Sequence, residues 1–268
     1  MEKENKLLVP FDFTLPADNA LQMASILAMK GNMKIVLLHV EGNKSNGEAS
    51  SRLREISGRI SAEHQVECSF KVRQGNILSE IAKEAGAEDS YRFVIIGTHG
   101  FKGVREKFFG LDMLHLVKNL TVPVIVLQEH TKIPEGGIRR IVFPAGAHRT
   151  FARNIEATIY FSKIFGAEVL LYSIEKSEQD WSEALKNNIE LAMQSFEAQQ
   201  VPYKHITEGQ VVFSTGYAKQ IVKYAREAEA HLIAVMALPS QEHFYIADSD
   251  KERLLTNEAG IPVLFTNS

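Results

Sequence analysis

The fold is decided by a short apolar stretch that occurs twice, as LLVPFD at positions 7–12 and as IVFPAG at positions 141–146. An amphipathic stretch follows each copy, with apolar residues at helical spacing. A second apolar run comes next and ends at Glu41 in one half and at Glu175 in the other. The run in the first half begins and ends at the same distances from Pro10 as the run in the second half does from Pro144, so the chain contains one unit twice.

The halves also agree further along the chain, where apolar strands alternate with amphipathic helices. Matching strands are expected at 66–72 and 202–207, at 93–96 and 232–235, and at 122–127 and 261–265. Strands that are apolar throughout are typical of parallel sheets covered on both faces. The sequence therefore predicts an α/β protein of two tandem, doubly wound, mostly parallel five-stranded sheets. The domains are expected at 1–130 and 138–268, joined by a linker with one proline and two glycines.

Composition limits the classes of protein that the chain could be. It has 268 residues, of which 45% are hydrophobic and 24% charged, which is typical of a globular protein. The net charge of −3 lacks the basic bias of nucleic-acid binders. No apolar window approaches the roughly 18 residues that a membrane span needs, and the start is unlike a signal peptide. A single cysteine, Cys68, fits a reducing compartment, so we expect a cytoplasmic protein.

A glycine-rich loop follows the fourth expected strand of the first half, with GTHGFKG at positions 97–103 and Gly110 before the next helix. Glycine allows close approach of backbone N–H groups to a ligand. A helix N-terminus adds free donors and positive dipole charge, a combination that suits phosphate. Glycines after buried strands also serve as simple turns. The loop is neither a Walker loop nor a dinucleotide fingerprint.

The spacing Gly97-x2-Gly100-x9-Gly110 resembles the ATP-binding signature of the universal stress protein family. Pro10-Phe11-Asp12 at the end of the first strand, His39-Val40 at the end of the second and the VPVIV run at 122–126 also resemble that family. The resemblance covers essentially the whole chain as two copies. It implies a Rossmann-like fold of the adenine nucleotide alpha hydrolase type and a role in stress response.

The resemblance also implies a ligand, ATP with Mg²⁺, and a set of residues that would contact it. The position of Asp12 would contact the ribose or adenine, and the backbone of Val40 would hold the adenine. The glycines would flank the ribose and phosphates. The expected binding residues are Pro10, Phe11, Asp12, Val40, Ile96, Gly97, His99, Gly100, Gly103, Gly110, Leu111 and Asp112.

One departure from the family pattern lies at Leu111, where the signature has Ser or Thr. A lost hydroxyl bond to a charged group costs roughly 1.5–3 kcal/mol, or on the order of ten- to a hundredfold in affinity. The backbone N–H of Leu111 remains. Asp112 is useful to a phosphate only through a divalent cation. We therefore expect weakened binding rather than none.

The second copy lacks the loop. Counting back from Pro123 and from Pro262, Gly97 corresponds to Met236. Counting forward from Pro10 and from Pro144, Asp12 corresponds to Gly146. The other glycines correspond to Pro239, Glu242 and Ser249, and Asp248 and Asp250 add negative charge nearby. We expect a structural partner lobe, or else a site for a different ligand.

The remaining residues give little support for catalysis. The nine histidines include no tight metal-ligand pair, and no nucleophile turn is present. No catalytic residue and no metal site is therefore assigned. The sequence favours a nucleotide-binding regulatory protein that is not an enzyme. A scaffold or small-ligand binder that needs no nucleotide is the alternative, and a weak ATP hydrolase is less favoured.

The closing strands lead to an expectation about assembly. Universal stress proteins dimerise by pairing their last strands edge to edge. A tandem chain can make this pairing internally, between 122–127 and 262–265, and so cover two apolar edges. We expect two lobes about a pseudo-two-fold axis, a pattern that is also compatible with a homodimer of such chains.

Overall fold

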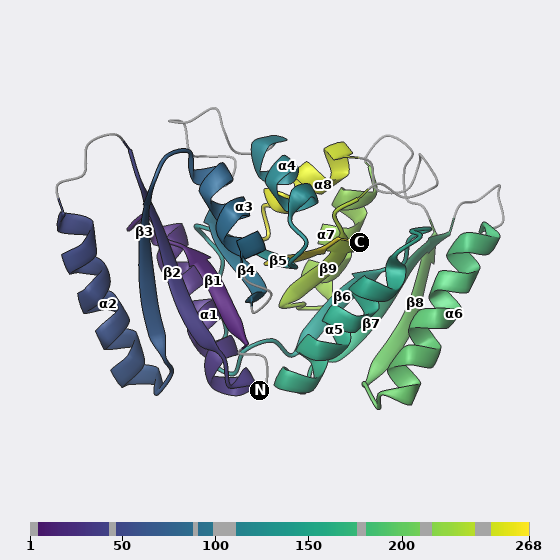
Figure 1. Ribbon diagram of the computed structural model, residues 1–268. Helices are drawn as coiled ribbons and strands as arrows, with labels where there is room; N and C mark the ends of the chain where they lie inside the picture. The colour runs from purple at the N-terminus through teal and green to yellow at the C-terminus, as the bar shows by residue number, and fades with distance from the viewer. Residues whose placement is uncertain are drawn as a thin grey trace. The chain divides into compact units, whose positions relative to one another are not determined.

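The computed structural model describes residues 5–42, 47–87, 91–98, 111–175, 181–209, 216–238 and 248–267, without the side chains at 111–112, 175 and 248–249. The chain forms two compact units, Met1–Ile133 and Pro134–Ser268. In each unit strands alternate with helices (Figure 1). The predicted α/β class is therefore observed.

The first unit contains β1 to β5 and α1 to α4. Its elements are β1 (Lys6–Pro10), α1 (Leu15–Gly31), β2 (Lys34–Glu41), α2 (Glu48–His64), β3 (Cys68–Gln74), α3 (Ile77–Ala87), β4 (Tyr91–Thr98), α4 (Leu111–Asn119) and β5 (Val124–Gln128). The strand order is β3-β2-β1-β4-β5. Every pair of neighbours in it is parallel.

The second unit repeats this plan. Its elements are β6 (Arg140–Pro144), α5 (Phe151–Phe165), β7 (Glu168–Glu175), α6 (Glu183–Ala198), β8 (Tyr203–Gly209), α7 (Tyr217–Glu227), β9 (Leu232–Met236), α8 (Asp248–Leu255) and β10 (Val263–Thr266). The order β8-β7-β6-β9-β10 matches that of the first unit, again with parallel neighbours. The predicted tandem five-stranded sheets are confirmed.

The strand order determines which face each helix covers. From β1 to β3 the chain steps one way along the sheet, and from β3 to β5 it steps back. Because parallel crossovers are right-handed, α1 and α2 cover one face and α3 and α4 the other. The packing agrees, since α1 contacts α2 and α3 contacts α4. Both faces are thus covered, which explains why Leu7, Leu8 and Val9 of β1 are all fully buried.

Local sequence signals set several helix ends. Pro16 lies in the first turn of α1, where its missing N–H costs least. Asn32 ends α1 in the left-handed conformation, which asparagine tolerates. Gly166 ends α5 in the same way, and Ser182 caps α6 by accepting a hydrogen bond from the N–H of Leu185. In the described ranges no helix is both long and apolar enough to cross a membrane.

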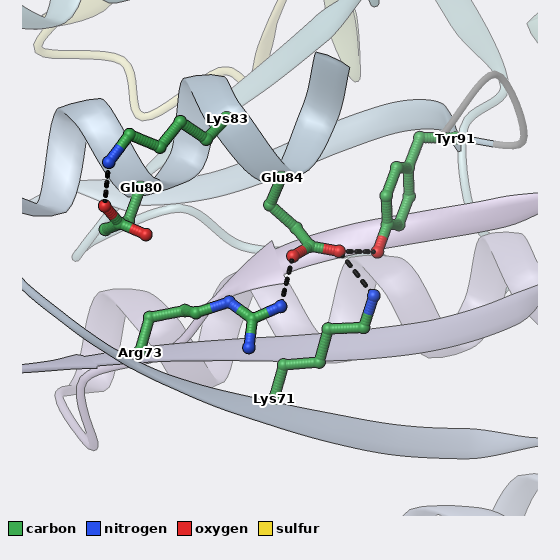
Figure 2. A network of polar contacts seen from close by, with 6 residues as sticks. All are labelled: Lys71, Arg73, Glu80, Lys83, Glu84 and Tyr91. Carbon is green, nitrogen blue, oxygen red and sulfur yellow. Dashed lines mark hydrogen bonds and ion pairs between the residues drawn. The ribbon is translucent and has the colours of Figure 1, made fainter. Parts of the chain in front are cut away.

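A buried carboxylate fastens α3 to the sheet of the first unit (Figure 2). Glu84 is 5% exposed and accepts hydrogen bonds from Lys71 Nζ at 2.6 Å and from Tyr91 Oη at 2.8 Å. Arg73 Nη2 adds an ion pair at 3.3 Å. The partners come from β3 and β4, so one side chain ties the helix to two strands that are not neighbours.

The environment of Glu84 sets its protonation. Burial by itself raises the pKa of the carboxyl, because it disfavours the charged form. The hydrogen bonds from Lys71 and Tyr91 and the charges of Lys71 and Arg73 outweigh burial, so the pKa is lowered overall. The folded protein therefore favours ionised Glu84 more than the unfolded chain does.

In the second unit, α7 is fastened by aromatic contacts instead. The ring of Tyr172 on β7 stacks on Tyr224 of α7, with centroids 4.4 Å apart and planes 11° apart. Tyr172 Oη donates to Glu208 Oε2 on β8 at 2.7 Å. Burial, and then the bond to Glu208, raise the pKa of Tyr172. The two units thus share a fold while using different chemistry at the same helix.

The Glu84 network predicts a pH-dependent loss of stability. Glu84→Gln keeps the shape of the side chain and removes its charge, which should lower the free energy of unfolding by about 1.5–3 kcal/mol at pH 7. The folded pKa lies below the unfolded value of about 4.3. The difference between wild type and variant should therefore be constant above about pH 5 and shrink as the pH falls below 4. Urea unfolding across this range measures it.

Glu80→Gln is the matched control, because among the described residues Glu80 forms its ion pair with Lys83 of the same helix, and Lys83 is 71% exposed while Glu80 is 13% exposed (Figure 2). Such a pair is worth at most about 1 kcal/mol. Equal losses in the two variants would contradict the role given to the Glu84 network.

Candidate functional site

The carboxyl ends of β1 and β4 form the switch point of the first sheet. The two strands are neighbours, and the chain leaves β1 for α1 on one face and β4 for α4 on the other. Ligands of open α/β sheets bind in the crevice at such a point. The candidate residues must therefore be judged by what these two strand ends present.

Gly97, near the end of β4, allows the start of α1 to lie directly on the sheet. A Cβ built on Gly97 would stand 1.9 Å from the carbonyl oxygen of Pro16 and 2.7 Å from the nitrogen of Ala17. Any side chain would therefore force the first turn of α1 away from β4. This glycine has a packing role that is independent of any phosphate.

Asp12 opens the loop between β1 and α1. Its Oδ1 accepts hydrogen bonds from the backbone N–H and the hydroxyl of Thr14, at 3.1 Å and 2.5 Å. The side chain is exposed, and its second oxygen has no protein partner in the described ranges. Phe13, between the two, has a φ of 64°, which is uncommon for a bulky residue and typical of strained functional loops. The loop thus holds a carboxylate at the strand end.

Val40 presents backbone groups that the sheet does not use. Alternate residues of β2 direct their N–H and C=O to opposite neighbours: Leu38 accepts from the N–H of Phe11 on the β1 side, and Glu41 accepts from Gly75 on the β3 side. Val40 therefore faces the β1 side, but β1 has already ended at Pro10, opposite Leu38. Across the described segments neither backbone group of Val40 has a hydrogen-bond partner.

The other predicted binding residues fall into three groups. Phe11 and Ile96 are buried in the core beside the site, and Pro10 ends β1. Leu111 and Asp112 begin α4, but their side chains are not described. His99, Gly100, Gly103 and Gly110 lie outside the described residues. The structure thus brings Asp12, Val40 and Gly97 to one end of the sheet, and their contact with a ligand stays a prediction.

A cationic and aromatic cluster beside Asp12 was not predicted from the sequence. The guanidinium carbon of Arg52 lies 4.0 Å from the centroid of the Phe13 ring. The Phe13 ring also contacts His39, whose Nδ1 lies 2.7 Å from the carbonyl oxygen of Phe11. The three residues come from α2, the β1–α1 loop and β2, so no sequence spacing connects them. The sequence singled out His39 only together with Val40, and its spacing gave no link to Phe13 or Arg52.

Burial also affects the protonation of Asp18, which lies in the first turn of α1. Burial raises the pKa of Asp18; the charge of Arg59 lowers it, and that of Asp12 raises it, with a net rise. In the parts of the chain that are described, no group of three or more His, Cys, Asp or Glu residues could hold a metal ion.

In the second unit, the position that matches Asp12 lies just after β6 and is covered by neighbouring side chains. Gly146 stands at that position, and the ring of His148 lies so close that a Cβ on Gly146 would be 2.7 Å from it. Asn188 of α6 donates from Nδ2 to the carbonyl oxygens of Gly146 and His148, at 2.8 Å and 2.9 Å. Where the first unit has an exposed carboxylate, the second unit therefore has backbone carbonyls bound by the Asn188 side chain.

Met236 is the counterpart of Gly97. Strand registers establish this, because Gly97 pairs with Leu127 as Met236 pairs with Thr266 at the ends of equivalent strands. Met236 is 2% exposed, and the hydroxyl of Thr266 lies 3.2 Å from its sulfur. A buried side chain thus fills the space that Gly97 leaves to the start of α1.

Ile174 is the counterpart of Val40, and its carbonyl is occupied. Ala145 donates to Tyr172 as Phe11 donates to Leu38, so Ile174 faces the end of β6 as Val40 faces the end of β1. The indole Nε1 of Trp181 donates to the carbonyl oxygen of Ile174 at 3.3 Å. The acceptor that has no partner among the described residues of the first unit therefore has a counterpart that binds an aromatic N–H in the second.

Two charged residues of α8 also form hydrogen bonds with backbone groups of the second unit. Asp250, expected to place negative charge at a phosphate position, instead accepts from the N–H of Ala218 in the first turn of α7, at 3.3 Å. Lys251 is fully buried and donates from Nζ to the carbonyl oxygen of Ala237 at 2.8 Å. Of the other corresponding positions, Pro239 and Glu242 lie outside the described residues, and the side chains of Asp248 and Ser249 are not described.

Comparison with known proteins identifies the fold. No family model and no curated protein matches the chain. A universal stress protein from Archaeoglobus fulgidus DSM 4304 is similar in structure at 16% identity, with a TM-score of 0.74, covering 100% of this chain and 99% of that one. The chain has the fold of the universal stress proteins.

Two further structures share this fold. A putative universal stress protein from Pseudomonas aeruginosa UCBPP-PA14 has a TM-score of 0.68 at 16% identity, covering 98% of this chain and 93% of that one. The cytoplasmic domain of a prokaryotic cation chloride cotransporter has a TM-score of 0.56 at 13% identity, with 98% and 95% covered. Because one fold is found in both kinds of protein, the site must decide the function.

The close contact at Gly97 predicts opposite effects of two alanine substitutions. Gly97→Ala should lower the free energy of unfolding by about 1–3 kcal/mol, because the new methyl group meets backbone. Gly58→Ala, in the middle of α2 with no atom near its Cβ position, should raise it by about 0.4–1 kcal/mol. Thermal and urea unfolding measure both. A neutral Gly97→Ala would show that α1 does not depend on this contact.

Proposed function

We propose that the chain is a universal stress protein that binds an adenine nucleotide through its first unit, and that this nucleotide is ATP. The supporting observation is the N–H and C=O of Val40, which face beyond the end of β1. A backbone donor and acceptor side by side suit the edge of a purine, which also carries both. The equivalent carbonyl, at Ile174, already accepts an aromatic N–H from Trp181.

In the proposed complex the ligand lies across the switch point. Asp12 would accept hydrogen bonds from ribose hydroxyls, since its carboxylate is exposed at the strand end. The ribose would pass over Gly97, where a side chain would displace the start of α1. The glycine loop and the backbone N–H of Leu111 would then receive the phosphates.

We propose that Mg²⁺ enters together with the phosphates. A cage made only of protein ligands has no candidate in the described ranges, and Mg²⁺ commonly keeps several waters and binds through one or two carboxylates. Asp112 would supply such a carboxylate. We infer a binding and regulatory role in stress response, in the cytoplasm, rather than catalysis. A scaffold that uses no nucleotide is the alternative, and Leu111 is the residue that favours it.

Nucleotide binding predicts a stabilised protein. Saturation with MgATP at about 100 times Kd should add roughly 2.7 kcal/mol to the free energy of unfolding. Asp12→Asn keeps an oxygen for Thr14 and loses the charge, so it should weaken binding about tenfold. Asp18→Asn, in the first turn of α1, is the control and should bind as wild type does. No change in melting temperature at millimolar ATP would refute the proposal.

Restoring a hydroxyl at position 111 tests the weakened phosphate contact. Leu111→Ser should tighten MgATP binding by roughly ten- to a hundredfold, because it returns a hydrogen bond to a charged group. Titration calorimetry with ATP and with adenosine separates this gain from base binding. An equal gain for adenosine would contradict the assignment of position 111 to the phosphates.

We further propose that the two units pair through β5 and β10, each the last strand of its own sheet. Both strands are apolar along most of their length, and an exposed apolar edge favours aggregation. Solution scattering tests the pairing. A chain of this length folded as one compact particle should have a radius of gyration of about 18 Å. A clearly larger value with two resolved lobes would exclude the pairing.

A further inference from the structure

The loop that carries Asp12 depends on the side chain of Phe13. Phe13 has a φ of 64°, a conformation that is costly for a bulky residue and persists only where its surroundings impose it. On either side of it, Thr14 donates two hydrogen bonds, from its N–H and its hydroxyl, to one oxygen of Asp12. The position of the Asp12 carboxylate therefore depends on the contacts that keep the Phe13 side chain in place.

Three groups contact the Phe13 ring. The ring of Phe11 lies edge-on to it, with centroids 5.5 Å apart and planes 84° apart. The centroid of the His39 ring lies at 4.9 Å, and the guanidinium carbon of Arg52 lies at 4.0 Å. Phe11 is 1% exposed in the core, whereas Arg52 is an exposed residue of α2. The ring thus lies between side chains of the strand ends and a cation from a helix.

The same ring connects the two groups that the proposed nucleotide site uses. Phe13 directly follows Asp12, and His39 directly precedes Val40. A cation is attracted to the face of an aromatic ring, so Arg52 holds Phe13 beside His39. The contact therefore fixes the Asp12 carboxylate relative to the backbone groups of Val40.

We propose that Arg52 is a positioning residue of the nucleotide site. Through the Phe13 ring, its guanidinium keeps the Asp12 carboxylate where a ribose hydroxyl would meet it. This inference rests on the proposed function, because the ribose and the base are the parts of the ligand concerned. A group that acts through Phe13 pre-organises the free protein and needs no contact with the ligand. Its loss should therefore affect adenosine and MgATP equally.

Replacement of Arg52 tests this role in binding. Arg52→Leu removes the cation and should weaken adenosine and MgATP by the same factor, roughly two- to fivefold, as expected for an exposed cation–π contact. Arg52→Lys keeps a cation and should recover most of the loss. Arg54→Leu is the control, because Arg54 is exposed on the same helix but points about 200° away from Arg52, and it should bind as wild type does.

Titration calorimetry with the two ligands measures these effects. A loss that is several-fold larger for MgATP than for adenosine would show that Arg52 attracts the phosphates directly, and this result would overturn the proposal. Equal losses in Arg52→Leu and Arg54→Leu would also overturn it, because a contact with the Phe13 ring would then contribute nothing of its own.

A double-mutant cycle tests whether Arg52 acts through the ring. Phe13→Leu keeps an apolar side chain and removes the aromatic face, so it should weaken adenosine binding as Arg52→Leu does. The variant with both changes should bind no more weakly than the weaker single variant, because both substitutions remove the same contact. Losses that multiply would mean that the two residues act independently, contrary to the proposal.

Hydrogen exchange of the free protein gives a readout that needs no ligand. The backbone N–H of Thr14 donates to Asp12 Oδ1 at 3.1 Å, so its exchange rate reports the order of the loop. Arg52→Leu should speed this exchange several-fold, and Arg54→Leu should leave it unchanged. An unchanged rate in Arg52→Leu would overturn the positioning role whether or not nucleotide binds. A faster rate in a protein that binds no nucleotide would support the contact and refute the proposed function, so the two failures are distinguishable.

Discussion

The contact between the end of β4 and the start of α1 constrains the whole first unit. Because Gly97 has no side chain, the carbonyl of Pro16 can approach the strand more closely than any other residue would allow. The same helix is tied to the end of β5 by Asn19, which donates to the carbonyl oxygens of Gln128 and Glu129. With α1 fixed at both points, the chain must turn sharply after β1. That turn strains Phe13 and leaves the end of β2 without a neighbour on one side.

The second unit shows that the fold does not require this open end. At the three strand-end positions that the structure describes in both units, the second unit supplies an internal group. Met236 fills the space over β9, Asn188 clamps the strand end, and Trp181 takes the carbonyl of Ile174. The sheet order and the registers remain the same. The openness of the first unit is therefore a property of its side chains, and the shared fold does not impose it.

Much of this could be predicted from sequence because it depends on spacing. The repeat, the alternating elements and the equivalence of Gly97 with Met236 all follow from distances along the chain. The contact of Arg52 with Phe13 and the bond from Trp181 to Ile174 could not be predicted in this way. They join elements whose approach is set by tertiary packing, and a single arginine or tryptophan carries no periodic signal.

Asp250 illustrates the same limit for charge. Its place in the sequence suggested a residue that repels phosphate, but its carboxylate caps α7, where positive φ at Gly216 lets the chain start the helix. A carboxylate near a helix N-terminus is stabilising whether or not a ligand is nearby. The sign of a charge was therefore predictable, but its partner was not. The stronger argument about ligands comes from backbone groups such as those of Val40, because an acceptor that the sheet cannot satisfy must find water, a side chain or a ligand.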